Sequence, residues 1–119
     1  MFLPETVVTN HDIAKLCDTN DEWIRKRTGI HERRFAEEGV GSADLGTKAS
    51  LMALEDSGVS AEDLDAIICC TVTPNQVAPA NAQLIQADIG ATNAAGFDLN
   101  AACSGFVFGL STANAFINN

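Results

Sequence analysis

Residues 97–110, FDLNAACSGFVFGL, place Cys103 where a strand is expected to give way to a helix. Phe97–Leu99 is typical of the end of a strand, and the apolar residues after Ser104 indicate a buried helix. The free N–H groups and positive dipole end of a helix N-terminus stabilise a thiolate, the reactive form of cysteine. The same N–H groups can bind the oxyanion formed when sulfur attacks a thioester or ester carbonyl. Cys103 is therefore a candidate nucleophile.

The neighbours of this cysteine are small. Ala101, Ala102 and Gly105 let backbone and substrate approach closely, and the arrangement follows the logic of a nucleophile elbow with Cys in the place of Ser. Cysteine is nevertheless more often a small buried residue than a nucleophile, and position alone favours that interpretation. The role of Ser104 is similarly undecided, since a serine in the first turn of a helix is more often a cap than a nucleophile.

The chain is acidic, but its positive charge is concentrated. The 119 residues carry a formal net charge of −9, with a pI of about 4.3, which argues against general nucleic-acid binding. The apolar content suffices for the core of one domain. Five of the seven Lys and Arg residues fall within one short stretch: Arg25, Lys26, Arg27, Arg33 and Arg34. Such a patch favours a small anionic ligand or an acidic partner.

The cysteine pattern and the hydropathy of the sequence indicate the cellular compartment of the protein. No apolar run is long enough to span a bilayer and no signal-peptide pattern is present, so no membrane association is expected. Cys17, Cys69, Cys70 and Cys103 lack the spacing of zinc ligands, so no metal is expected. A small secreted disulfide scaffold is denser in cysteine. We therefore expect reduced thiols in the cytoplasm.

Capping residues and apolar spacing predict a series of helices. Thr9 or Asn10 caps a short helix that carries Ile13, Leu16 and Cys17 on one face. The cluster 19–22 opens a second helix that ends near Gly29. A one-turn segment is expected at 60–63. Three longer helices are expected, from Ser42 to Gly58, from Pro79 to Gly90 and from about Ser104 towards Ile117.

Strands are expected only at 66–72 and 94–99, and none precedes the first helix. The continuous apolar run at 66–72, AIICCTV, is typical of a strand buried on both faces, as in parallel sheets. Cys69 and Cys70 should then be inert, which weakens the alternative that they or Cys103 act as redox sensors. Strands alternating with helices predict an α/β fold with a mainly parallel sheet flanked by helices.

The segment 97–106 resembles the active-site segment of β-ketoacyl-acyl carrier protein synthase III, the initiating condensing enzyme of type II fatty acid synthesis, an acyltransferase of the thiolase fold. Further segments resemble the family's pattern in the same order and spacing: 4–10, 18–24, 27–30 and 71–74. The resemblance implies that residues 1–119 are the N-terminal half of a duplicated fold, a fragment without its second half.

The resemblance also implies roles for individual residues. Cys103 would take an acyl group from acyl-coenzyme A, with its own N–H in the oxyanion hole. Trp23 would stack on the adenine of coenzyme A, Thr19 would hydrogen-bond the base, and Arg27 would meet the phosphate region. From the residues alone, Trp23 could equally be a core anchor. Arg33 and Arg34 would attract an acidic carrier protein electrostatically.

One departure from the family concerns Ala78. Family members often carry an aromatic residue here, which reaches across a homodimer to close the acyl pocket. The smaller alanine is expected to admit a longer or branched primer, because pocket size sets which acyl chain fits.

The family's catalytic histidine and asparagine, which promote decarboxylation of malonyl-acyl carrier protein, match no residue here. His11 and His31 are expected to be surface or capping residues. No cofactor is expected, since acyl-coenzyme A is a substrate. Two alternatives stay open: a related thiolase-fold synthase of secondary metabolism, and a non-catalytic module that binds acyl thioesters.

Overall fold

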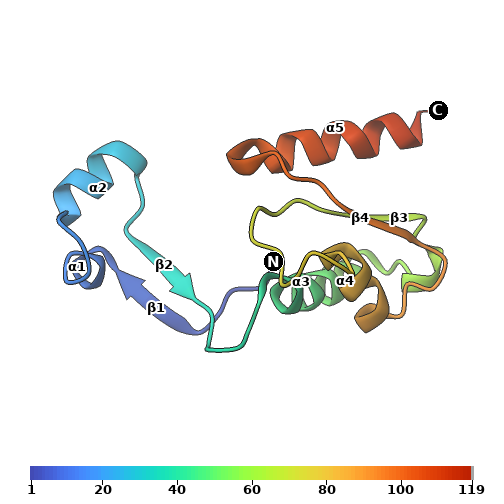
Figure 1. The fold of residues 1–119 in the computed structure, drawn as a ribbon, viewed down its shortest axis with the longest axis horizontal. Helices are drawn as coiled ribbons and strands as arrows, with labels where there is room; N and C mark the ends of the chain where they lie inside the picture. Colours follow the sequence, from blue (N-terminus) through green and yellow to red (C-terminus); the bar gives the residue numbers. More distant parts are fainter. Residues whose placement is uncertain (119) are drawn as a thin grey trace. The chain divides into compact units, whose positions relative to one another are not determined.

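The computed structural model describes residues 1–118 of the chain. These divide into two compact units (Figure 1). The small unit is Leu3–Val40, and the large unit runs from Gly41 onward and includes Met1–Phe2. Each unit is described by itself. The prediction that the whole chain is one half of a duplicated fold stays a prediction.

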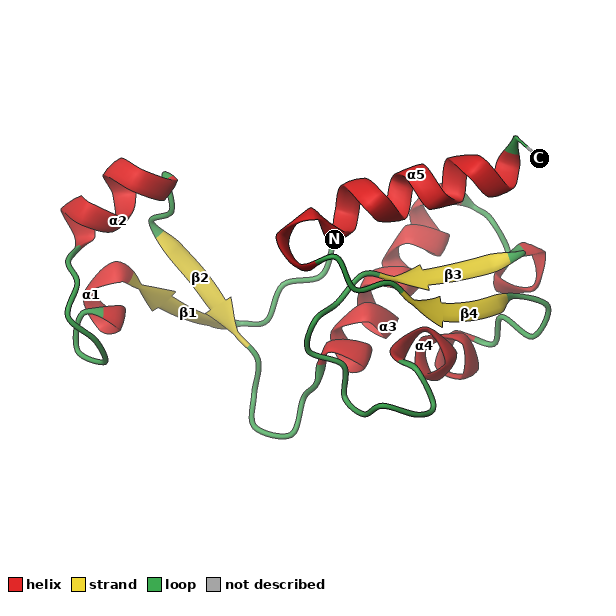
Figure 2. Ribbon diagram, turned by 45° about the horizontal axis from the view of Figure 1, so that its top comes forward, coloured by secondary structure: helices red, strands yellow, loops and turns green. Residues whose placement is uncertain are grey.

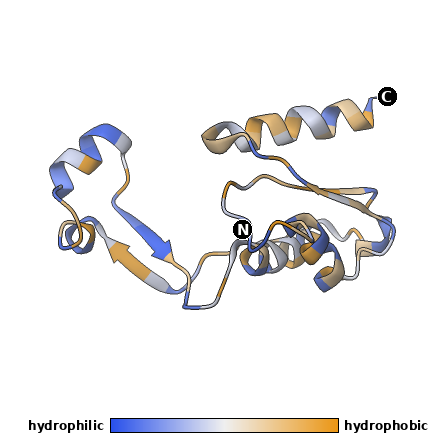
Figure 3. Ribbon diagram, in the orientation of Figure 1, coloured by the Kyte–Doolittle hydropathy of each residue, from blue (hydrophilic) through white to orange (hydrophobic). Residues whose placement is uncertain are grey.

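The small unit contains a pair of antiparallel strands. β1 (Thr6–Thr9) pairs with β2 (Glu32–Phe35), with Thr6 opposite Phe35 and Thr9 opposite Glu32. The prediction that no strand precedes the first helix is therefore wrong. β1 is apolar and β-branched whereas β2 is polar, as Figure 3 shows. The polar ERRF segment carries no alternation that would identify a strand, and pairing with β1 makes it one.

Both helices of the small unit begin where predicted and α2 ends where predicted, but α1 ends at Ile13 and does not include Leu16 and Cys17. Thr9 caps α1 (Asn10–Ile13) through a reciprocal bond with Asp12. α2 (Asp21–Thr28) begins after Asn20, whose side-chain oxygen accepts the N–H of Trp23 at 2.8 Å. Gly29 ends α2 with φ of 72°, a conformation that favours glycine.

The large unit contains a parallel pair of strands between helices. β3 (Ala66–Cys69) pairs with β4 (Ala95–Asp98), with Ala66 opposite Ala95 and Cys69 opposite Asp98. Figure 2 shows α3 (Ser42–Ser57) and α4 (Asn81–Ile89) on one side of the strands and α5 (Gly105–Ile117) on the other. Short 3₁₀ turns precede β3 (Ala61–Asp63) and α5 (Ala102–Ser104). The predicted parallel sheet between helices is thus confirmed.

The core of the large unit lies on the α3–α4 side of the strands. It consists of Ala43, Ile85, Ile89, Ala91 and Ala94, with Leu54 and Ile67 packed against it. The opposite side differs, because α5 buries only Gly105 and Gly109. Most of its large apolar side chains are exposed, including Ile117 at 82%.

Two burial predictions are therefore wrong. The helix after Cys103 is not buried in this chain, since only Gly105 and Gly109 of its residues are buried. The strand at 66–72 is only half-buried and ends at Cys69, which leaves Cys70 exposed beyond it. Cys70 is thus not an inert core thiol. Among residues 1–118, no helix has the length and apolar character needed to cross a membrane.

Candidate functional site

Cys103 lies on a tight turn between a strand and a helix, as predicted. The turn Ala102–Ser104 follows the end of β4 and leads directly into α5. Ala102 has φ of 46°, in the left-handed region that alanine rarely adopts. Such local strain is often found at functional positions, where the surrounding structure enforces it. The turn presents Cys103 at the surface, since its side chain is exposed.

The position of the turn is set by the sheet. The N–H of Leu99 donates to the carbonyl of Cys69 at 2.9 Å, so the pairing continues to the point where β4 ends. Because β3 and β4 are parallel, the chain leaves both strands at the same edge. The backbone N–H of Cys103 has no hydrogen-bond partner within the described part of the chain. It is therefore available to an incoming oxygen atom.

Sequence reasoning missed the part that Cys70 plays at this edge. A Cβ atom added to Gly105 would lie 3.3 Å from the Cβ of Cys70, and one added to Gly109 would lie 2.5 Å from its Sγ. Glycine at these positions lets α5 approach the end of β3. The signal in the sequence is the four-residue spacing of the two glycines, which places both on one face of a helix.

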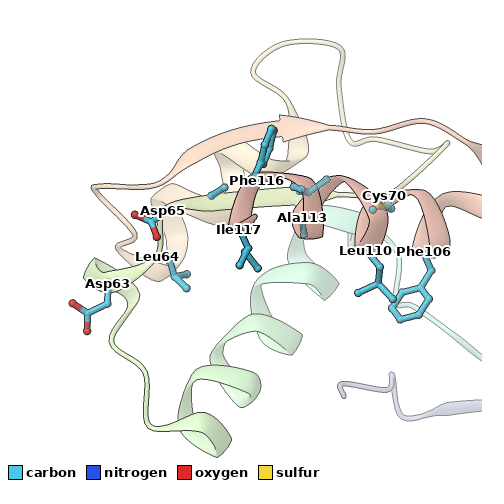
Figure 4. Close-up of a pocket in the computed structure, with 12 residues that line it drawn as sticks. Asp63, Leu64, Asp65, Cys70, Phe106, Leu110, Ala113, Phe116 and Ile117 are labelled. Atoms are coloured by element: carbon cyan, nitrogen blue, oxygen red, sulfur yellow. The ribbon is translucent and has the colours of Figure 1, made fainter. Parts of the chain in front are cut away.

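A groove of about 810 Å³ runs between β3 and α5 (Figure 4). Apolar side chains from both elements line it, among them Ile68, Leu110 and Phe116, with Cys70 at the base of α5. Cys103 is not among the lining residues. The candidate nucleophile and the apolar groove are therefore separate features of the large unit.

Cys69 differs from the exposed thiols. It is half-buried in β3, and burial, with the nearby Asp98 carboxylate adding to it, raises the pKa of the Cys69 thiol. Cys69 is thus a poor nucleophile, in agreement with the prediction for this residue.

Ala78 lies on the exposed loop between β3 and α4. The tip of the loop is Val77, which is 96% exposed, and Ala78 follows it in an Ala–Pro pair. Its predicted contact is with a second subunit, so that role stays a prediction.

The predicted coenzyme A residues all lie in the small unit. Trp23 is 52% exposed on α2, and the guanidinium carbon of Arg27 lies 4.8 Å from the centre of its ring. The two residues are four apart on one helix, and the geometry is that of a cation–π pair. Ile24, not Trp23, is the buried residue of this helix. Trp23 is therefore not a core anchor.

Thr19 lies just before the cap of α2. Its hydroxyl oxygen is buried and has no hydrogen-bond partner among residues 1–118. A buried hydroxyl without a partner is costly, and such groups usually have one. Thr19 therefore has an unused hydrogen-bonding group close in sequence to Trp23.

Asn10, which the sequence suggested only as a cap, is the polar centre of the small unit. Its side chain is buried and donates to Asp21 and to the carbonyl of Ile30, both at 2.8 Å. Arg33 donates to the Asn10 oxygen at 2.7 Å and to the carbonyl of Val8. The Asn10 bond, and after it Arg25, lowers the pKa of Asp21. This network joins both ends of α2 to the strands.

Arg33 and Arg34 are engaged within the small unit. Arg33 has the structural contacts just described, and Arg34 donates to the carbonyls of Pro4 and Glu5. The Arg33 guanidinium is therefore used in bonds within the small unit and is not free to bind a partner. His11 and His31 are exposed, as predicted. No cluster of potential metal ligands occurs within residues 1–118.

The architecture of parallel strands, flanking helices and a cysteine on the turn after a strand is that of the thiolase fold. A 3-oxoacyl-acyl carrier protein synthase III structure from Aquifex aeolicus superimposes with a TM-score of 0.90 and 45% identity, over 98% of this chain and 38% of that one. The priming β-ketosynthase of the R1128 polyketide pathway gives a TM-score of 0.86 and 39% identity, over 94% of this chain and 34% of that one.

The sequence comparisons indicate the same family. The family model described as 3-oxoacyl-acyl carrier protein synthase III matches residues 97–119. β-Ketoacyl-acyl carrier protein synthase III 1 of Bacillus anthracis is 53% identical over 98% of this chain. The resemblance to this family is thus confirmed over nearly all of the sequence. The chain spans about 37% of the length of that relative, which is consistent with one half of the fold.

Proposed function

We propose that this chain carries the acyl-accepting part of a β-ketoacyl-acyl carrier protein synthase III. Cys103 is the nucleophile, and acyl-coenzyme A is the donor. The observation that carries the proposal is the exposed Cys103 on a strained turn between β4 and α5. The match to relatives of this name over 98% of the chain supports it.

In the first stage, the thiol of Cys103 loses its proton to solvent and its sulfur attacks the thioester carbonyl. The unpaired N–H of Cys103 donates to the oxyanion that forms on the carbonyl oxygen. When this intermediate collapses, the bond to the coenzyme A sulfur breaks, and coenzyme A leaves as a thiolate that takes up a proton. The acyl group remains on Cys103 as a thioester.

Coenzyme A is proposed to bind the small unit. The exposed Trp23 ring offers a stacking surface for adenine, and the Arg27 guanidinium beside it offers charge to the phosphates. Thr19 is proposed to hydrogen-bond the base, which requires its buried and unpaired hydroxyl to become exposed when coenzyme A binds. The acyl group of the same molecule is proposed to be transferred to Cys103.

The second stage belongs to the whole enzyme. There, malonyl-acyl carrier protein loses carbon dioxide, and its carbanion attacks the acyl-enzyme to give a β-ketoacyl product. The histidine and asparagine that the family uses for this step have no counterpart in this chain. We expect no condensation by these 119 residues alone. Ala78 and a homodimer are proposed to shape the acyl pocket.

A polyketide-priming synthase is the second candidate. It is favoured by the 39% identity and 0.86 TM-score of the R1128 priming ketosynthase. The chemistry at Cys103 would be the same, and only the acyl donor and the carrier would differ. The four free cysteines support a cytoplasmic location for either enzyme.

The test is intact-mass spectrometry of the chain after incubation with a panel of acyl-coenzyme A species. One acyl group per chain is expected, absent in Cys103→Ala and retained in the matched variant Cys70→Ala. Trp23→Ala should slow the acylation roughly tenfold, because base stacking contributes about 1–3 kcal/mol. An adduct that persists in Cys103→Ala would disprove the assignment. An acyl-thioester-binding module would bind the panel equally well without Cys103.

A further inference from the structure

The loop that carries Val77 and Ala78 is closed at its base by side chains. The N–H of Asn75 donates to the side-chain oxygen of Asn81 at 2.9 Å. Between these two residues, hydrogen bonds among the described residues occur only at Ala80, whose N–H donates to the side chain of Gln83 at 2.9 Å and whose carbonyl accepts the N–H groups of Gln83 and Leu84. The base of the loop is therefore held by the Asn75–Asn81 closure, together with the Asn75 side chain, whose oxygen accepts the N–H of Ala43 at 3.0 Å.

Asn81 is held from several directions. Its side chain is 0% exposed, and its amide group donates to the hydroxyl of Ser42 at 2.7 Å. Ser42 in turn donates to the carbonyl of Thr73 at 2.6 Å, which lies at the start of the same loop. Both ends of the Asn81 amide are thus used, and both lead back to the segment between β3 and α4.

The backbone of Asn81 is tied to β4. The N–H groups of Asn81 and Ala82 donate to the two carboxylate oxygens of Asp98, at 3.0 and 2.8 Å. A carboxylate at this place satisfies free N–H groups at the start of α4. Asp98 is the last residue of β4, five positions before Cys103. One residue therefore connects the Val77–Ala78 loop to the strand that leads to the nucleophile.

We propose that Asn81 is a positioning residue that fixes the Val77–Ala78 tip relative to the carboxyl end of β4. The Asn81 side chain is uncharged and, being buried, does not contact substrate. This placement of the tip also contributes to the choice of acyl group, a consequence that rests on the proposed function. Loosening the closure would let the tip occupy several positions, so the enzyme would discriminate less between short and branched acyl chains.

The test compares amide hydrogen exchange in the full chain and in Asn81→Ala, with Gln83→Ala as the matched control. Gln83→Ala removes the bond to Ala80 at the same helix start but leaves the Asn75–Asn81 closure. Rates are normalised to the amide of Leu99, which reports on the sheet. In Asn81→Ala the Asn75 amide should exchange roughly tenfold faster, as expected for loss of a buried hydrogen bond. In Gln83→Ala only the Ala80 amide should accelerate.

Equal Asn75 rates in the two variants, or an unprotected Asn75 amide in the unaltered chain, would overturn the proposal. Asn81→Ser serves if Asn81→Ala does not fold, because serine suits a helix start and its hydroxyl is too short to replace the amide. The second readout is the ratio of branched to acetyl transfer onto Cys103, which should shift severalfold in Asn81→Ala alone. An unchanged ratio would refute the role in acyl choice. If the unaltered chain accepts no acyl group, the proposed function fails, and exchange still decides the positioning role.

Discussion

At the scale of single residues, buried amide side chains organise this chain. Asn10 in the small unit and Asn81 in the large unit are 1% and 0% exposed, and each bonds to several segments. A buried amide is stable only when its donors and acceptor are used, so such a residue fixes its neighbours in one arrangement. In both units, a segment carrying a candidate binding residue is attached to such an asparagine.

The Asn10 network predicts a pH dependence for the small unit. The pKa of Asp21 is lowered by the Asn10 bond first and by Arg25 second, from an ordinary value of 3.8. The unfolded chain therefore binds a proton at Asp21 before the folded chain does. The contribution of Asp21 to stability is fully present above pH of about 4, and it is lost as the pH falls below that value.

The measurement is thermal unfolding between pH 2 and 7, followed by the fluorescence of Trp23, the single tryptophan of the chain. Asp21→Asn should unfold at a lower temperature at neutral pH and show a weaker dependence on pH below about 4. Glu22→Gln is the matched control, because it removes one charge from the same helix turn. Equal acid dependence in Asp21→Asn and the unaltered chain would contradict the prediction.

At the scale of elements, the approach of α5 to β3 depends on glycine. A Cβ on Gly109 would lie 2.5 Å from the Sγ of Cys70, so Gly109→Ala must displace the helix or the thiol. We expect a net loss of about 1–3 kcal/mol in the free energy of unfolding, as for other overpacked contacts. Cys70→Ala removes the sulfur and should restore most of this loss in the double variant.

Denaturant unfolding of the single and double variants measures this coupling. Gly105→Ala is the control, because its added Cβ would face the Cβ of Cys70, which Cys70→Ala retains. Rescue of Gly109→Ala without rescue of Gly105→Ala is the expected pattern. Additive effects of Gly109→Ala and Cys70→Ala would show that the sulfur is not the obstacle.

The elements also show how far sequence reasoning reaches. Local signals identified each α-helix of the described residues, because caps such as Asn20 and ends such as Gly29 are encoded within a few residues. β2 was missed because its polar sequence becomes a strand only through pairing with β1, more than twenty residues away. The Asn81 bonds to Ser42 and Asp98 join segments that no local pattern connects. The junction position of Cys103 was predictable because a strand and a helix meet there in the sequence.

At the scale of the whole chain, exposed apolar surface is combined with a large negative charge. The net charge of −9 opposes association, whereas α5 exposes the side chains of Phe106, Leu110 and Ile117. Figure 3 shows the apolar residues repeated along this helix. Contiguous exposed apolar patches promote association of the molecules that bear them. Screening of the charge by salt should shift the balance further towards association, because repulsion between exposed charges weakens.

We therefore expect the 119-residue chain to self-associate through α5, increasingly so between low and high salt. Leu110→Lys should reduce association several-fold, because a charged head in the apolar patch must be dehydrated to enter a contact. Ser111→Lys is the control, because it adds the same charge to the same helix but alters a residue outside the apolar groove. Sedimentation velocity across a salt series distinguishes them. A chain that stays monomeric at high salt, or equal effects of the two lysines, would show that the α5 face does not drive association.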